Sequence, residues 1–389
     1  MAECPIHNAQ FRMNAGAEHL AAVNAREGKS PMHAALKVGA SVLALLAVAA
    51  AKVPPARAQS LAVKPDTSAS AAGPVTITSR PLSGFEKLDQ GRTTFGRLQW
   101  LGGLVLSSSD SRFGGWSGLA MDADGKRLLA VSDAGTWMMA DVVYKQGRPT
   151  GLARSRLGPL KARDGGPLKR DRDRDAEAVV LSSGSLTKGR VMIAFEQNHR
   201  IGVFDVTSDG LRAPSNYLPV PADARRMRPL RGLEALTELR AGAHKGALVA
   251  IAERFTDARG HHSGWIMARG AAHRFALTDM GGYEPTDAVG LANGDLVVLE
   301  RRFRWLEGVK MRLRRIAAGE LKPGAVIAGE VLLEADMSQE IDNMESVAAH
   351  TDTSGATVLT LMSDDNFNGL LQRTVLLQFR LADNRSARQ

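Results

Sequence analysis

The feature of this sequence that most restricts its fold is a layout that recurs five times along the chain. Each copy begins with a short apolar run, passes through a turn and ends in a second apolar run that finishes at an acidic residue. Equivalent positions in the first run are held, at nearly even spacing, by Gly118, Glu177, Glu234, Asp287 and Glu345. The acids that end the second run are Asp133, Glu196, Glu253, Glu300 and Asp364. Internal repeats of this length are typical of arrays in which each unit packs between its neighbours.

One or two further strand-like runs follow each pair, and about four strands per repeat is the composition of a propeller blade. We therefore predict an all-β fold, a single β-propeller for which five blades are favoured. A sixth blade is the alternative, if residues 93–112 form a degenerate copy. The run from Gly96 to Leu106 is predicted to be an N-terminal strand that completes the last blade and closes the ring.

The N-terminus has the pattern of an export signal. Basic residues precede a small and apolar run over residues 36–51, and Ala56-Arg57-Ala58 fits a small-x-small cleavage site. The run is short for a membrane span, so we expect none in the mature chain and a periplasmic or secreted location; an uncleaved anchor is the alternative. The predicted segments are a signal peptide with a start-site extension at 1–58, a linker at 59–91, the propeller at 92–382 and a tail at 383–389.

The charge and composition favour small ligands over nucleic acids. The net charge is +9, but aromatic residues make up only 5% of the chain and no nucleic-acid-binding motif accompanies the basic excess. The expected partner is therefore a small anionic substrate or an envelope ligand.

The repeated acids predict a cation site. In a propeller the first strands line the central channel, so acids at equivalent blade positions converge on its axis. Carboxylate and amide oxygens without thiolates suit Ca²⁺, with Mg²⁺ as the alternative. The candidate ligands are Asp133, Asp175, Glu177, Glu196, Asn198, Glu234, Glu300, Asp342, Glu345 and Asp364. The competing interpretation is that these acids cap backbone amides or pair with arginines.

Basic residues follow the acidic strand ends, and they predict an anion site beside the cation. The candidates for substrate binding are Arg200, Arg254, Arg301 and Arg302. A guanidinium can hold a phosphate through two hydrogen bonds, although ordinary ion pairing is the alternative for each of them. Glu196 or Glu253 is the candidate general base, if burial raises its pKa.

Several short motifs resemble the phytase-like family described as having esterase-like activity of phytase. They are Ser117-Gly118-Leu119, Val131-Ser132-Asp133-Ala134-Gly135, Asp175-Ala176-Glu177, Gly232-Leu233-Glu234-Ala235-Leu236 and Ser363-Asp364. The resemblance extends over residues 92–382 and implies a propeller that hydrolyses a phosphate ester or another ester. Propeller phytases hold calcium in an acidic cleft, but here Gly118 stands where the other four repeats carry an acid.

These observations lead to one expectation about function, with two alternatives. We expect an exported, metal-dependent hydrolase of a phosphate ester or a related ester. The alternatives are a non-catalytic periplasmic propeller that binds a ligand or protein, and a lactonase-like hydrolase. Whether the chain is an enzyme at all is left open by the residues alone.

Overall fold

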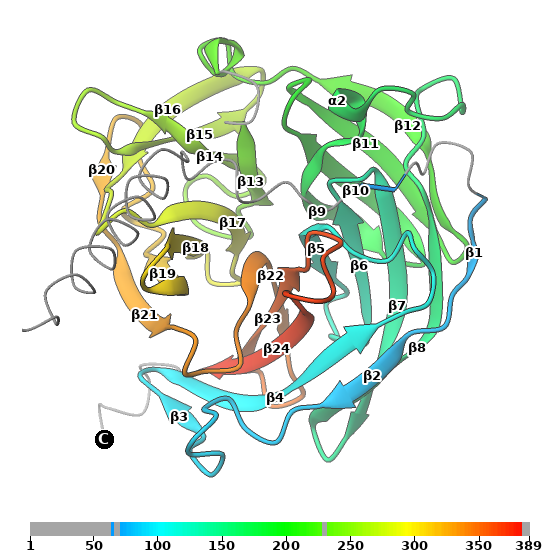
Figure 1. Cartoon of the computed structure of the whole chain (residues 1–389). Coiled ribbons are helices and arrows are strands. Elements are labelled where there is room, and N and C mark those ends of the chain that lie inside the picture. Colours follow the sequence, from blue (N-terminus) through cyan, green and yellow to red (C-terminus); the bar gives the residue numbers. More distant parts are fainter. Residues whose placement is uncertain (1–63, 66–70, 228–231, 383–389) are drawn as a thin grey trace, which may run out of the picture. The chain divides into compact units, whose positions relative to one another are not determined.

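The structure is a computed structural model that describes residues 64–65, 71–227 and 232–382. These residues form an almost entirely β structure of five antiparallel sheets arranged in a ring (Figure 1). The prediction of an all-β propeller with five blades is confirmed. The predicted signal peptide and tail lie outside the described residues. Within the described part of the chain, no helix combines the length and the apolar character needed to span a membrane.

The blades follow one another along the sequence. The first contains β5 (Trp116–Met121), β6 (Arg127–Ser132), β7 (Thr136–Lys145) and β8 (Arg148–Pro159), with β1 (Gly73–Pro74) at its outer edge. The second contains β9 (Ala176–Ser185), β10 (Lys188–Phe195), β11 (Arg200–Thr207) and β12 (Gly210–Leu218), and the short helix α2 (Asp171–Arg174) precedes it. The third contains β13 (Leu233–Glu238), β14 (Leu248–Thr256), β15 (His262–Ala268), β16 (Ala271–Leu277) and β20 (Val326–Ile327), preceded by the 3-10 turn η3 (Ala224–Arg226).

The last two blades complete the ring. The fourth contains β17 (Glu284–Gly290), β18 (Leu296–Arg304), β19 (Gly308–Ile316) and β21 (Glu330–Ala335). The fifth contains β22 (Asn343–Thr351), β23 (Thr357–Asp364), β24 (Thr374–Leu381), β4 (Leu98–Ser107) and β2 (Thr78–Pro81), and β3 (Thr94–Phe95) pairs with β4. Thus β4, from the N-terminal side, lies next to β24 from the C-terminal side, with Leu104 opposite Leu376.

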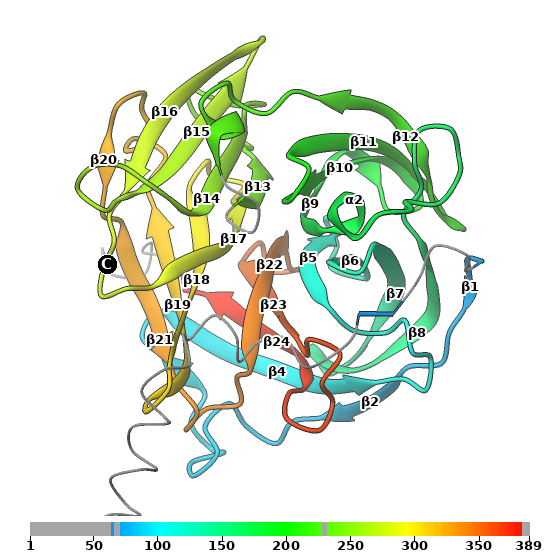
Figure 2. The ribbon, with the colours of Figure 1, turned by 45° about the horizontal axis from the view of Figure 1, so that its top comes forward.

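The first strand of each blade lies nearest the ring axis (Figures 1 and 2). Each of these strands contacts the first strand of the next blade, and β22 contacts β5, so that the five form a circle. Side chains on both faces of such a strand are buried between neighbouring sheets, which explains why β5 is buried along its whole length and does not alternate between polar and apolar residues.

The hydrophobic core is divided among the blade interfaces. Five clusters of buried apolar residues lie between the five pairs of neighbouring sheets. Between the first two blades, for example, Val131 and Trp137 pack with Ile193 and Phe204. Because each sheet is covered by its neighbours, a single blade would expose two apolar faces, and the ring is the unit that can fold.

The segment expected to be a linker, residues 59–91, differs from that expectation where it is described. Residues 73–74 and 78–81 add strands to the first and fifth blades. Phe85 is fully buried, with ring centroids 4.9 Å from Phe95 and 5.5 Å from Trp100. The segment is poor in apolar residues, but Phe85 and Leu82 are part of the buried core and Val75 and Ile77 pack against it.

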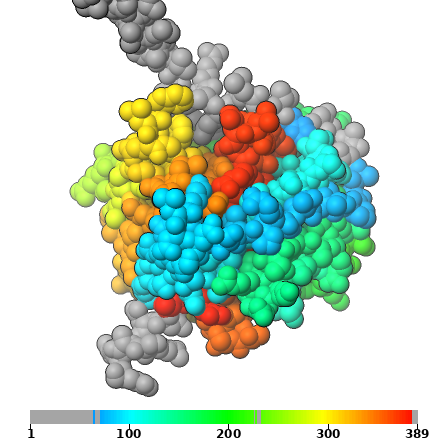
Figure 3. Space-filling view, turned by 60° about the horizontal axis from the view of Figure 1, so that its bottom comes forward, coloured from blue at the N-terminus to red at the C-terminus, as the bar shows by residue number. Residues whose placement is uncertain are grey.

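All first strands begin, and all second strands end, at the same end of the ring, which we call the acid face. Two loops project from it, the β18–β19 hairpin and the loop after β23, drawn in yellow and red at the upper edge of Figure 3. Both have exposed apolar tips, with Trp305 82% and Leu306 94% exposed in the hairpin and Leu370 97% exposed in the loop.

Candidate metal and substrate site

Three carboxylates of the second blade meet at the centre of the acid face. Asp175 immediately precedes β9 and Glu196 immediately follows β10, and the Glu196 amide donates to the Asp175 carbonyl at 2.9 Å. Strand pairing therefore brings the two acids side by side, and Glu177 lies on the next inward position of β9. One oxygen from each of the three lies within 4.8 Å of the others. Asp175 and Glu196 are buried, and Glu177 is partly buried.

Asp133 extends this group from the first blade. It follows β6, and its amide donates to the Gly115 carbonyl at 3.0 Å. Gly115 has a φ of 67°, and a Cβ there would lie 2.4 Å from Asp133 Oδ1, so only glycine leaves room for this carboxylate. Asp133 Oδ1 is buried and accepts no hydrogen bond.

Lys64 contacts the same carboxylates and was not among the residues singled out from the sequence. Its Nζ lies 2.8 Å from Asp133 Oδ2 and 3.3 Å from Asp175 Oδ1. Burial opposes the charged ammonium, but the attraction of Asp133 and Asp175 is larger in sum and raises the pKa of Lys64 above its ordinary value. A single lysine in a polar, low-complexity segment carries no sequence signal for such a contact.

Further acids from the third and fifth blades face this group. Burial raises the pKa of Glu234 well above its ordinary value, and repulsion from Glu177, Glu196 and Glu253 adds to the shift. The pKa of Asp364 is raised by burial and by repulsion from Asp133. Carboxylates repel one another in this way only when they share a confined space. The structure therefore brings together most of the acids predicted to converge on the axis.

Arginines partly neutralise the other side of the acid face. Arg301, within β18, is mostly buried and places Nη1 3.3 Å from Glu345 Oε1 and Nη2 3.8 Å from Glu253 Oε1. Arg254 donates to both carboxylate oxygens of Glu284 at 2.6 Å. Burial opposes the ionised form of Glu284, but Arg254 holds the pKa of its carboxyl below the ordinary value. Glu284 begins β17 outside the repeated acidic positions, so the repeat pattern did not reveal it.

The two acids considered as general bases have raised pKa values. Burial, together with repulsion from Asp175, raises the pKa of Glu196 to about 7, against a hydrogen bond from the Gly232 amide at 2.8 Å. Burial and repulsion from Glu284 raise the pKa of Glu253 to about 8, against the attraction of Arg254 and Arg301. Either carboxyl can therefore change its protonation state near neutral pH.

The structure places two of the predicted metal ligands outside this site. Glu300 is fully buried in an ion pair with Arg314, and Arg312 Nη1 lies 3.6 Å from its other oxygen. Asp342 accepts hydrogen bonds from the amides of Asn343 at 3.0 Å and Arg373 at 3.1 Å. The competing interpretation therefore applies to both residues: Glu300 pairs with arginine, and Asp342 caps backbone amides.

Three other candidates also make structural contacts. Asn198 donates to Asp173 Oδ1 at 2.9 Å. Arg200 stacks on Phe195 with its guanidinium 3.8 Å from the ring centroid and donates to the carbonyl of Asn198. Arg302 donates to Glu307 Oε2 at 2.6 Å within the β18–β19 hairpin. These side chains stabilise the loops around the acid face and are already engaged there.

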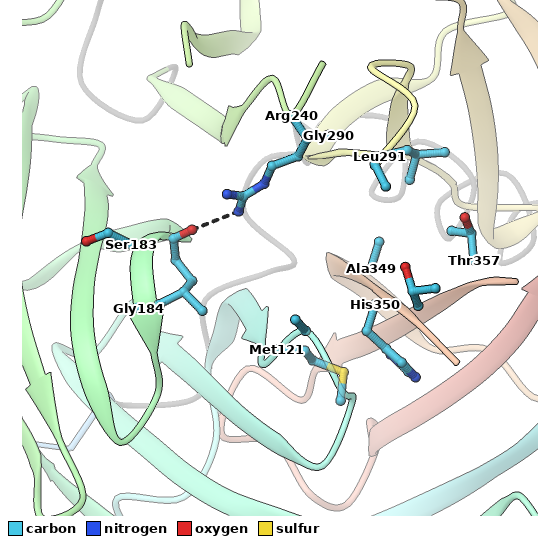
Figure 4. A pocket seen from close by; sticks show the side chains of 13 residues that line it. Met121, Ser183, Gly184, Arg240, Gly290, Leu291, Ala349, His350 and Thr357 are labelled. Atoms are coloured by element: carbon cyan, nitrogen blue, oxygen red, sulfur yellow. Dashed lines mark hydrogen bonds between the residues drawn. The ribbon is translucent and has the colours of Figure 1, made fainter. Parts of the chain in front are cut away.

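The ring axis is narrow and apolar below the acids. Leu119, Val179, Leu236 and Val347 line a hollow of only about 40 Å³ at mid-height. At the opposite end a cavity of about 440 Å³ is lined by residues including Arg240, which donates to the Leu181 carbonyl at 2.7 Å (Figure 4). None of the candidate acids lines that cavity.

The donor set fits a hard divalent cation. The ligand atoms of Asp175, Glu177 and Glu196 are all carboxylate oxygens, the type preferred by Ca²⁺ and Mg²⁺. The unpartnered Asp133 Oδ1 provides a further buried acceptor on the adjoining blade. A bound cation would also lower the pKa values that burial has raised, so that these carboxyl groups would be ionised near neutral pH.

Comparison with known proteins identifies a family for this chain. No curated protein matches this chain. A gluconolactonase from Xanthomonas campestris is a similar solved structure, with 13% sequence identity and a TM-score of 0.37 over 82% of this chain and 99% of its own. The family model for phytase-like proteins, described as esterase-like activity of phytase, matches residues 111–367. This match covers most of the propeller, and the chain therefore belongs to the phytase-like family.

Proposed function

We propose that this protein is a metal-dependent hydrolase of a phosphate ester or a related ester. The observation that supports the proposal most directly is the meeting of Asp175, Glu177 and Glu196, with one oxygen from each within 4.8 Å of the others. These residues would hold the cation, with calcium as the first candidate and magnesium as the second. When bound, the cation would offset the negative charge of the ester oxygens.

Glu253 is the preferred general base. Its pKa of about 8 suits proton transfer near neutral pH, and it lies outside the carboxylate triad that would hold the cation. In its ionised form it would accept a proton from the water that attacks the ester. Glu196 is the less suitable choice because its Oε1 already accepts the Gly232 amide and its carboxylate belongs to the triad that would hold the cation.

Arg301 and Arg254 would orient the anionic part of the substrate. Arg301 is held between Glu253 and Glu345, and Arg254 is held by both oxygens of Glu284, so neither guanidinium needs to be ordered when the substrate binds. Arg254 is 40% exposed and is the more accessible of the two. Export is part of the proposal and rests on the apolar run that ends before Ala58, outside the described residues.

The test is a hydrolysis assay of the full chain with Ca²⁺ or Mg²⁺ against aryl phosphates, aryl carboxyl esters and lactones. Glu253→Gln should lower kcat at least about 100-fold, the usual contribution of a general base, and leave folding intact. Asp209→Asn, which removes an exposed carboxylate in the β11–β12 turn, is the matched control and should leave kcat unchanged.

Absence of turnover on every substrate class, with either cation, would reject the hydrolase. A chain that binds anions without turnover would instead be the binding propeller. Turnover confined to lactones would favour the lactonase-like alternative.

A further inference from the structure

A cationic group already lies within the acidic centre, and the chain itself supplies it. Lys64 Nζ is 2.8 Å from Asp133 Oδ2 and 3.3 Å from Asp175 Oδ1, and it therefore bridges carboxylates of the first and second blades. No other lysine in the described part of the chain forms an ion pair with these acids. The side chain of Lys64 is 47% exposed, so the ammonium lies at the solvent side of the acids.

The neighbouring residue gives the segment a second contact with the ring. Pro65 lines a hollow of about 510 Å³ at the acid face together with Phe113, Phe367 and Arg373, which come from the loops of the first and fifth blades. Residues 64 and 65 therefore both contact the acid face.

Asp175 is shared by two arrangements. Its Oδ1 accepts the Lys64 ammonium, and its carboxylate also belongs to the triad with Glu177 and Glu196. Asp133, the other partner of Lys64, has a second oxygen that is buried and without a partner. A divalent ion that bridged Asp133 and Asp175 would need the space that the ammonium fills, and two positive charges at that distance repel each other.

We propose that Lys64 is a tethered cation that competes with a divalent ion for Asp133 and Asp175. In the absence of the ion, Lys64 offsets the repulsion between these carboxylates. Binding of the ion displaces Lys64 from its contacts with these two carboxylates. This inference rests on the cation site of the proposed function, but it does not depend on the reaction that takes place there.

The test measures calcium binding to the full chain by titration calorimetry at low ionic strength, with calcium chloride as the only ligand. Lys64→Met keeps the length of the side chain and removes its charge, and it should tighten calcium binding roughly 2- to 5-fold, the range expected for an exposed ion pair. Lys64→Arg should retain most of the competition. Lys126→Met removes the same charge from the opposite end of the ring, where Lys126 lies 3.5 Å from Asp124, and should bind calcium like the unchanged protein.

A second measurement follows the lysine directly. Acetylation of Lys64, quantified by mass spectrometry, should be slow in chelator and should become faster when calcium is added, whereas acetylation of Lys126 should not respond. Asp133→Asn should accelerate acetylation of Lys64 without calcium, because it removes the shorter of the two contacts.

Unchanged or weaker calcium binding by Lys64→Met would overturn the proposal, as would the absence of calcium binding in every variant. A chain that hydrolyses no ester, yet shows tighter binding in Lys64→Met and calcium-dependent exposure of Lys64, would refute the proposed function and support this inference.

Discussion

Replacing Glu253 by Gln should make the metal-free protein more stable at pH 8 and leave its stability nearly unchanged at pH 5. Burial raises the pKa of Glu253 from 4.5 to about 8. Because the folded value lies above the unfolded one, the folded state holds this proton more tightly. The stabilisation is fully present below pH 4.5 and is lost as the pH rises through about 8.

The pKa gap sets the size of the effect. At ~1.36 kcal/mol per pKa unit, a shift from 4.5 to about 8 corresponds to ~5 kcal/mol. Arg254, Arg301 and Glu345 readjust when one member of the network is removed, so we expect about half of that, roughly 2 kcal/mol, as the gain at pH 8.

The assay is urea denaturation in chelator at pH 5 and pH 8, comparing the unchanged protein, Glu253→Gln and the exposed control Asp209→Asn. The difference between Glu253→Gln and the unchanged protein should grow with pH, and the control should show no such growth. An advantage at pH 8 no larger than at pH 5, or a loss of stability at pH 8, would refute the assignment of Glu253 as a buried acid that is destabilised when ionised.

Three further outcomes follow from the same contacts. Calcium at 100 times its Kd should stabilise the fold by ~2.7 kcal/mol at pH 8, seen as a higher Tm that chelator reverses, and an unmoved Tm would count against the cation site. Glu300→Gln should cost about 3 kcal/mol in urea unfolding, because Arg314 would remain buried without its anionic partner; a cost below 1 kcal/mol would contradict this. Gly115→Ala should lose more stability than Gly147→Ala, since both have positive φ but only the first places a Cβ against Asp133; equal losses would show that the contact is unimportant.

The fold could be predicted from the sequence because the same pattern of apolar runs and acids occurs once in every blade. Each second strand ends at an acid, and blades of similar length bring those ends to one side of the ring, so the spacing predicted both the five sheets and the face that carries the acids. The prediction of five blades used five copies of the repeat. An irregularity within a single copy therefore did not hide the repeat.

The members of the candidate site were harder to predict, because the direction of each side chain depends on the local strand register. Glu253 and Glu300 hold equivalent places in the repeat and are each followed by arginine. Glu300 remains within the regular ladder of β18 with β19, opposite Arg312, and this pairing directs it to Arg314. The β14–β15 ladder is interrupted between Ile251 and Thr256, and Glu253 lies in that irregular stretch. A repeat alignment contains no information on such interruptions.

Contacts that a single residue makes with distant parts of the chain could not be predicted from the sequence either. Lys64 reaches acids far along the chain, and Phe85 anchors a segment whose composition favours a linker. Neither belongs to a periodic pattern, and each depends on how the folded ring places residues that are far apart in the sequence.

The pairing of β4 with β24 has a consequence for the order of events during folding. The fifth sheet joins residues 98–107 with residues 374–381, so its central hydrogen bonds span most of the polypeptide. Contacts between such distant positions are slow to form because the intervening loop must first be closed. During biosynthesis β4 emerges early and can pair with β2 and β3, but the edge that pairs with β24 has no partner until the last strands leave the ribosome. A truncated chain that lacks β24 would thus expose an unpaired, apolar strand edge. Such an edge is a target for chaperones and proteases.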